Sequence, residues 1–542
     1  MPAGQAFSAE PRADQEIRSA QRRLELSGNM LDRLSSSPVA GRNSAGKGIL
    51  VVDFAQKQLD STRKAALLPL LLIILLAVLL RLYQIDYNLD GDEIASVHIS
   101  TGSFSHVIDL TIQDRVHPPL YYILLAFWIK LFGSSEVSVR ALSVLISVIF
   151  LVVLYRLVLR FTDDNTALFV VLICSLSPYF VFYGEQARPY SLIACFSTLS
   201  FYFLLKHFEQ PDRKQWRILY GLSCMGLIYS QYMGVLILLP EFAAIFISKV
   251  RNKYKLLSYG LAGMLSIVVW FEVMARTLTP AYLLKNDKGQ TGLDWILKPV
   301  LIDIPAFYVD IFGRLPIKGN LRLSLVALLL LVAAFLVASI VIRHSSVDLR
   351  LALTLIALSS FAPVAAWLIS RYGPKSIWAS RQLIGSAVFF ICLIGMGMTV
   401  GLRRRWVGVV LGSMLAMWCV FTVPGAFPQH SRPPWRSMAR TLGDRARGED
   451  VFGEEPWTVV PLRYYSRDNS VYDLSDYENQ PDTADRIVFV CRPTRCEKLG
   501  KFTNVYRIRD KEVMSFGSAG GTQETSTIID IYFLEREKAS KT

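Results

Sequence analysis

Residues 65–83 read AALLPLLLIILLAVLLRLY, an apolar run in which Arg81 is the one charged residue. As a helix this run would be about 28 Å long, close to the roughly 30 Å thickness of a bilayer core. The chain then turns polar at residues 89–94, LDGDEI, and stays polar as far as His117. This change predicts a first membrane crossing that ends in a long polar loop.

The composition of the whole chain agrees with that start. Of its 542 residues, 52% are hydrophobic and 19% are charged, so a disordered chain is excluded and a soluble protein is disfavoured. Apolar blocks of 16 to 24 residues alternate with short basic loops, which is typical of a polytopic membrane protein. The net charge of +14 therefore reads as a topology signal rather than as a nucleic-acid surface.

Loop charge fixes the predicted topology. The apolar piece 119–132 is too short to cross comfortably, at roughly 21 Å, and is expected to lie at the interface. With the N-terminal tail inside, the basic loops then all fall on the inner side. The eleven predicted crossings are 65–83, 136–158, 165–183, 190–206, 217–232, 233–249, 257–277, 321–342, 351–370, 382–402 and 406–424.

The predicted fold is mainly α: a bundle of about eleven transmembrane helices, with juxtamembrane helices in the first external loop and a small C-terminal extracytoplasmic α/β domain. We expect the Cys491 and Cys496 thiols either to bridge in an oxidising compartment or to stay free. The expected parts are a largely disordered cytoplasmic tail 1–63, a membrane module 64–424 with external loops 84–135 and 278–320, and a tail domain 425–542 with a helix at 435–445 and strands at 486–491 and 527–533.

Candidate functional residues gather at the outer ends of the predicted helices. The carboxylates of Asp90, Asp92 and Glu93 repel one another, so their arrangement is unfavourable unless it faces cations, a metal or a substrate hydroxyl. An exposed acidic turn is the simpler interpretation. His117 precedes two prolines that fix the backbone where the chain turns back toward the membrane. It could equally be an ordinary interfacial histidine.

Two further groups lie in later outer turns. Glu185 and Arg188 stand in FYGEQARPY (182–190), where they either serve a ligand or pair with each other. Arg371, Lys375 and Arg381 lie on the side that the loop-charge rule disfavours, which indicates an anionic ligand such as phosphate. Contact with lipid headgroups is the alternative.

Together these groups suit one reaction. Displacing a lipid phosphate from the anomeric carbon of a sugar needs a base for the attacking hydroxyl and cations for the leaving phosphate. The first-loop carboxylates offer the base, and the outer arginines and lysine offer the cations. No separate acid is needed, because the phosphate leaving group is already a weak base.

The order of motifs resembles the GT-C superfamily of polyprenyl-phosphate-sugar-dependent glycosyltransferases, of the protein O-mannosyltransferase and aminoarabinose transferase type. The matching pieces, spread over roughly residues 65–450, are the Asp92–Glu93 pair, His117-Pro118-Pro119 with the following YYILLAFWIKLFGSSEVSVRALSVL, then FYGEQARPY, SRQLIGS and PPWRSMARTL.

The resemblance implies a role for each matched residue. Asp92 would take the proton of the acceptor, and Glu93 would orient it or help to hold a divalent cation, which the reaction itself does not require. The remaining implied roles are these: His117 borders the acceptor or the sugar, Glu185 and Arg188 shape the sugar pocket, and Arg381, helped by Arg371 and Lys375, holds the donor phosphate. Gln382 departs from the tyrosine that family members commonly carry after this arginine.

The expected partners are a polyprenyl-phosphate-linked sugar, a hydroxyl acceptor on a saccharide, lipid or protein, and membrane lipid, with no nucleic acid. Transfer would occur with inversion at the outer face of a bacterial inner membrane, the N-terminus lying in the cytoplasm. The main alternative is a transporter or flippase of lipid-linked saccharides, favoured by Gln231, Glu241 and Glu272 in or near apolar segments. A membrane anchor with a partner-binding tail is a third reading.

Overall fold

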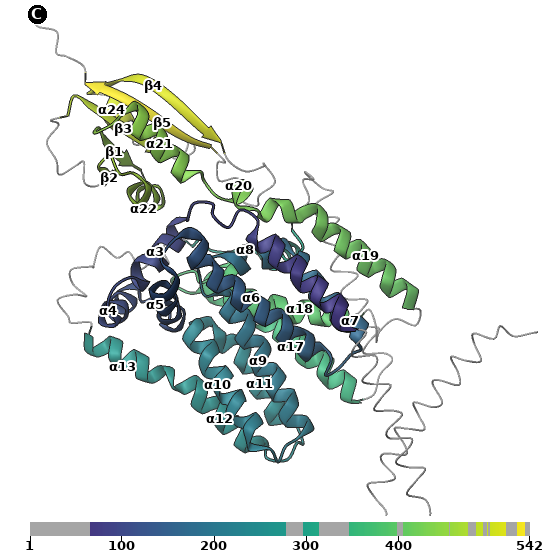
Figure 1. Cartoon of the computed structure of the whole chain (residues 1–542). Coiled ribbons are helices and arrows are strands. Elements are labelled where there is room, and N and C mark those ends of the chain that lie inside the picture. The colour runs from purple at the N-terminus through teal and green to yellow at the C-terminus, as the bar shows by residue number, and fades with distance from the viewer. Residues whose placement is uncertain are drawn as a thin grey trace, which may run out of the picture. The chain divides into compact units, whose positions relative to one another are not determined.

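The computed structural model describes residues 66–277, 296–313, 346–397, 405–454, 456–474, 484–491, 496, 499–503, 505–515 and 528–536. The predicted N-terminal tail and the crossing 321–342 lie outside these residues, as does most of the loop 278–320. Within them the protein is mainly helical, with one small sheet near the C-terminus (Figure 1).

The segment of the first predicted crossing forms the apolar helix Ala66–Leu82, which is shorter than the described helices that can cross a membrane by length and composition. Three short helices follow it: α3 (Gly91–Ser100), α4 (Phe104–Asp114) and α5 (Leu120–Phe132). The last of these is as short as the sequence predicts, and its first residue follows the rigid Pro118-Pro119 pair. The acidic motif lies at the start of α3, and His117 lies in the loop between α4 and α5.

The remaining helices build the membrane bundle. By length and composition, five described helices can cross a membrane, or six if one bent pair counts as a single span. This agrees with an integral membrane protein. The helices of the bundle are α6 (Glu136–Val158), α7 (Asp164–Leu176), α8 (Pro178–Glu185), α9 (Tyr190–Glu209), α10 (Lys214–Ser230), α11 (Val235–Ile247), α12 (Lys253–Leu265), α13 (Ile267–Thr277), α15 (Asp303–Asp310), α17 (Ser346–Tyr372), α18 (Ile384–Met396) and α19 (Arg405–Thr422).

The predicted crossing 165–183 is bent in the structure, because α7 and α8 meet at an angle of 65°. Pro178 has no N–H, so the carbonyl of Cys174 loses its helical donor. Arg81, fully buried, donates to that carbonyl at 3.5 Å and to the carbonyl of Phe180 at 3.1 Å. The first helix thus holds the bend that turns α8 toward Glu185.

The α/β tail domain is confirmed. Its sheet has the strand order β2-β1-β3-β5-β4, in which β1 pairs in parallel with β2 and β3, whereas β5 runs antiparallel to β3 and β4. The strands are β1 (Asp450–Gly453), β2 (Val471–Asp473), β3 (Arg486–Cys491), β4 (Tyr506–Ser515) and β5 (Ile528–Arg536), and the helices are α21 (Trp435–Arg445), α22 (Pro456–Tyr465) and α24 (Leu499–Thr503).

Alternation along β3 explains why both faces of this sheet are covered. Val488 and Val490 lie in one apolar cluster with residues of α21 and α22, whereas Phe489 lies in a second cluster with Phe502 of α24. Successive strand residues point to opposite faces. A strand that is apolar from Ile487 to Cys491 therefore needs helices on both sides.

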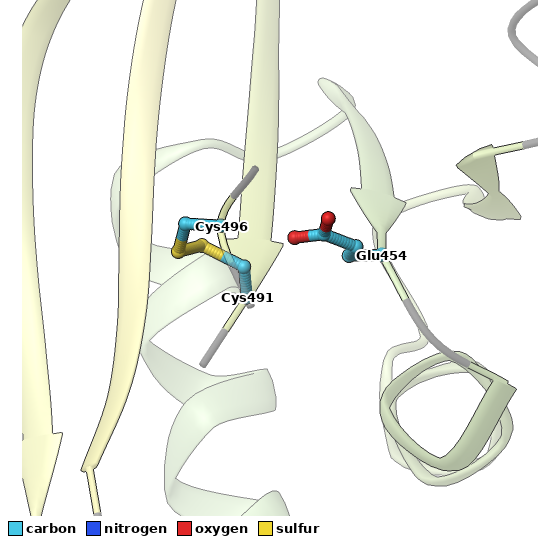
Figure 2. Close-up of side chains that lie close together, drawn as sticks. All are labelled: Glu454, Cys491 and Cys496. Atoms are coloured by element: carbon cyan, nitrogen blue, oxygen red, sulfur yellow. A yellow bond between two sulfur atoms is a disulfide. The ribbon is translucent and has the colours of Figure 1, made fainter. Parts of the chain in front are cut away.

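Cys491 and Cys496 form a disulfide. Figure 2 shows the side chain of Glu454 beside it, and these three residues are the group that could hold a metal among those that the structure describes. A thiolate binds metal, but both sulfurs are already bonded to each other. This cluster is therefore a cross-link and not a metal site.

Candidate active site

Asp92 lies in the first turn of α3, close to the N-terminal end of α18. The Nη1 of Arg381, in the 3-10 turn Ser380–Leu383, donates to Oδ2 of Asp92 at 2.9 Å. The Asp92 side chain is 44% exposed and that of Arg381 is 25% exposed. An acid from the first loop and a cation that follows 289 residues later therefore meet where solvent can reach both.

Glu93, the residue after Asp92, is completely buried and forms ion pairs with two arginines. Its carboxylate accepts from Nε and Nη2 of Arg140 in α6, at 2.8 and 2.6 Å, and from Nη1 of Arg432 at 2.9 Å. The backbone N–H of Ala187 adds a fourth bond at 3.0 Å. Glu93 also forms a capping box with Asp90 at the start of α3. These bonds fix the helix turn that carries Asp92.

Arg140 also holds the loop that leads into this turn. Its guanidinium donates to the backbone carbonyls of Ile85, Tyr87 and Asn88. A cation fully buried in an apolar helix needs such partners. Arg140 therefore ties the loop 85–88 to Glu93.

Arg432 comes from the segment just before α21 and is 1% exposed. Its second nitrogen donates to Oε1 of Glu185 at 3.0 Å. Because Arg432 also binds Glu93, one guanidinium joins the first loop, the end of α8 and the start of the tail. Glu185 and Arg188 therefore have other partners, and the alternative that they pair with each other is not what the structure shows.

Other contacts bring the same tail segment to the first loop. The hydroxyl of Tyr465 accepts from the backbone N–H of Leu89 at 2.7 Å, and Asn88 donates to the carbonyl of Pro433 at 2.8 Å. The first loop and the tail thus meet at one end of the bundle. The loop-charge analysis predicts this arrangement by placing both on one side.

Arg188 is buried on the other side of Asp92. It donates to the Asp92 carbonyl and to Oγ of Ser96, each at 3.3 Å, and its Nη2 lies 2.9 Å from Nε2 of His117. His117 in turn contacts Asp114 through Nδ1 at 2.9 Å. His117 therefore lies within this cluster, although its hydrogen bonds go to other protein groups.

Neighbouring charges set the protonation of the acidic pair. Burial alone would raise the pKa of Asp92, but the charges of Arg188 and Arg381 outweigh it and lower that pKa. For Glu93 the burial effect is likewise exceeded, by Arg140 and Arg432, and its pKa falls to about 2. Both carboxylates are ionised near neutral pH.

The other predicted cations lie before Arg381. Arg371 is exposed in the last turn of α17, and Lys375 is half-buried in the segment that leads to the 3-10 turn. Neither Arg140 nor Arg432 was predicted as a site residue. Arg140 had a visible signal, an arginine inside the apolar run EVSVRALSVL, whereas nothing in the sequence links Arg432 to Glu93.

The donor set does not suit a divalent cation. The Glu93 carboxylate is occupied by two guanidinium groups, and Arg381 faces the side chain of Asp92. Hard cations need several free oxygen ligands and are repelled by arginines. We therefore derive no step that involves a metal.

Glu241, the residue that most favours transport, lies fully buried in α11 and accepts from Ser200 of α9 at 2.8 Å. Gln231 accepts from the backbone N–H of Tyr232 through its own side chain. Both residues thus have partners inside the bundle.

Comparison with known proteins gives two results at the level of sequence. Residues 116–271 match the family described as dolichyl-phosphate-mannose-protein mannosyltransferase. An uncharacterized protein of Aquifex aeolicus (strain VF5) is 35% identical over 94 residues, which are 17% of this chain and 19% of that protein. The chain therefore matches only a small part of that relative.

Comparison with solved structures identifies a shared fold. ArnT from Cupriavidus metallidurans, bound to undecaprenyl phosphate, aligns with a TM-score of 0.53 and 12% identity over 85% of this chain and 97% of that chain. The Saccharomyces cerevisiae Pmt1-Pmt2 complex, bound to the sugar donor, aligns with a TM-score of 0.32 and 17% identity over 40% and 34%. The second score is too low to support an argument, and the first shows a shared fold.

Proposed function

We propose that the chain is a membrane glycosyltransferase that transfers one sugar from a polyprenyl phosphate to a hydroxyl group at the outer face of the membrane; the match of residues 116–271 to the dolichyl-phosphate-mannose-protein mannosyltransferase family and the fold shared with ArnT support this. The observation that carries this proposal is the Asp92–Arg381 contact of 2.9 Å. It joins a base and a phosphate-binding cation at a position that is partly open to solvent.

The proposed reaction is a single displacement. The acceptor oxygen forms a bond to the anomeric carbon as the bond from that carbon to the phosphate oxygen breaks. The proton of the acceptor moves to Asp92, and the polyprenyl phosphate leaves with the bonding electrons. One displacement at one carbon inverts its configuration.

Arg381 has two tasks in this scheme. Without donor it neutralises Asp92; with donor its guanidinium is drawn to the phosphate, which carries more charge and suits its planar fork. The ion pair between Arg381 and Asp92 is then weaker, and Asp92 becomes a stronger base. The donor thereby activates the base for its own transfer, with Arg371 and Lys375 as further cations on the approach to this position.

Glu93 acts indirectly. Because two buried arginines occupy its carboxylate, we assign it the task of fixing the turn that presents Asp92. Glu185 belongs to the same network through Arg432. His117 and Arg188 border Asp92 from the side of α4, where they shape the space for the acceptor or the sugar.

The donor and its location follow from the relatives and from loop charge. ArnT was solved with undecaprenyl phosphate, and we propose a polyprenyl-phosphate-linked donor here. The basic loops support an orientation with the N-terminus in the cytoplasm and the α/β domain outside, and we propose a bacterial inner membrane as the location. The eleven-helix count belongs to this proposal.

The test is sugar transfer by purified protein in detergent, where no compartments exist and transport cannot be scored. A panel of polyprenyl-phosphate sugars is offered with saccharide, lipid and peptide acceptors, and the product is identified by its mass and by the configuration at its anomeric carbon. We expect one donor to yield an inverted glycoside. A product of retained configuration would refute the displacement, and release of free polyprenyl phosphate with no glycoside would refute the transfer.

A further inference from the structure

A further carboxylate, that of Asp114, lies next to the proposed site. Asp114, the last residue of α4, is 24% exposed at its side chain. Its Oδ2 accepts from the backbone N–H of His117 at 3.1 Å, from the ring Nδ1 of His117 at 2.9 Å and from the hydroxyl of Tyr122 at 3.4 Å. Two of these three donors belong to one histidine.

The opposite ring nitrogen decides the protonation of that histidine. Nε2 of His117 lies 2.9 Å from Nη2 of Arg188, and a guanidinium can only donate. Nε2 must therefore accept, so the ring proton is on Nδ1, where Asp114 receives it. Burial and the charge of Arg188 lower the pKa of His117, in agreement with a neutral ring.

Arg188 carries the effect to Asp92. Only 3% exposed, it donates to the Asp92 carbonyl and to Ser96 while His117 holds its other nitrogen. If the ring proton moved to Nε2, two donors would face each other and Arg188 would lose this anchor. The charge that helps to keep Asp92 ionised would then be free to move away.

We propose that Asp114 is a positioning residue: its carboxylate holds His117 in the Nδ1–H form, so that Nε2 anchors Arg188 beside Asp92. The inference rests on the proposed function of Asp92 as base. No proton moves between Asp114, His117 and Arg188 during the reaction. The ionisable groups that interact with Asp92 include Arg188, Arg381, His117, Glu93, Asp90 and Tyr122.

The test compares Asp114→Leu, which removes the acceptor at similar size, with Asp114→Asn, which keeps a neutral acceptor. Asp109→Leu, an exposed position on the same helix, is the matched control. We expect Asp114→Leu to lower kcat about tenfold or more with little change in the KM for donor, because a displaced Arg188 no longer shapes the space beside Asp92 for the acceptor or the sugar. The acidic limb of its pH profile should rise by about half a unit or more, because Asp92 loses a cation.

The expected order is then wild type and Asp109→Leu together, Asp114→Asn between, and Asp114→Leu lowest. A loss of folded protein alone would lower kcat without moving the pH profile. An unmoved acidic limb in Asp114→Leu would therefore overturn the inference. Transfer by Asp92→Asn would instead overturn the proposed function, so the two failures are distinct.

A second variant isolates the route through the histidine. In His117→Gln the side-chain amide oxygen can accept from Arg188, and no ring tautomer has to be set. Asp114→Leu should then cost less than about threefold when added to His117→Gln. A full tenfold loss in that background would show that Asp114 does not act through His117.

Discussion

Replacing Glu93 by glutamine should separate structure from chemistry within the acidic pair. The change keeps the size of the side chain but removes the charge that two buried guanidinium groups face. Folding lowers the pKa of Glu93 from 4.5 to about 2, which corresponds to roughly 3 kcal/mol of preference for the ionised form.

An independent estimate agrees with this magnitude. Breaking a buried ion pair by removing one partner costs roughly 3–5 kcal/mol, because the other charge is left without compensation. Asp92→Asn should behave differently, because the pair that it breaks is 25% and 44% exposed. Pairs of that kind contribute about 1 kcal/mol or less.

The assay is thermal unfolding in detergent followed by tryptophan fluorescence, with Asp86→Asn, an exposed position of the same loop, as the control. We expect Glu93→Gln to lower Tm by several degrees, on the order of 5 °C. Asp92→Asn and Asp86→Asn should unfold close to wild type. Equal Tm values for Glu93→Gln and wild type would refute the reasoning, as would a fall in Asp92→Asn as large as that in Glu93→Gln.

Three further predictions follow from the same contacts. Arg381→Ala should raise the KM for donor or lower kcat by at least about tenfold, with partial recovery in Arg381→Lys; unchanged steady-state kinetics would assign Arg381 to lipid headgroups instead. Since the pKa of Glu93 is lowered by folding, its contribution to stability is complete above pH 4.5 and is lost as the pH falls toward 2; the Tm difference between wild type and Glu93→Gln should therefore shrink between about pH 5 and pH 3, and a constant difference would contradict the assignment. Cys491→Ser should destabilise the tail domain by about 2 kcal/mol, as expected for so short a loop, and limited proteolysis of the tail with and without reductant measures it; equal protection in both would count against the cross-link.

Local patterns in the sequence were sufficient for several elements. The helix at 435–445 and the strand at 486–491 have the predicted bounds, because periodicity and turn residues mark both ends. The short α5 was predicted from the length of its apolar run between prolines and Gly133. Each of these signals lies within about a dozen residues.

The bend between α7 and α8 shows where such patterns stop being sufficient. Pro178 signals a break, but an apolar run on both sides reads as one crossing. The 65° angle depends on Arg81, which reaches the freed carbonyl from another helix. Hydropathy contains no information about that contact.

The candidate site divides in the same way. Chemistry and loop charge placed Asp92 and Arg381 on one side of the membrane, and the structure brings them to 2.9 Å. The sequence did not predict that Glu93 would be buried and ion-paired with Arg140 and Arg432. That outcome depends on how α6 and the start of the tail pack against the first loop, over 47 and 339 residues of chain.

The most direct test of the account is the rate of sugar transfer by purified Asp92→Asn in detergent, measured together with its affinity for the lipid donor. We predict a loss of about 10²- to 10⁴-fold in kcat while the donor still binds, because the variant keeps the shape of the side chain but cannot take the proton of the acceptor. Turnover within about threefold of wild type would contradict the account.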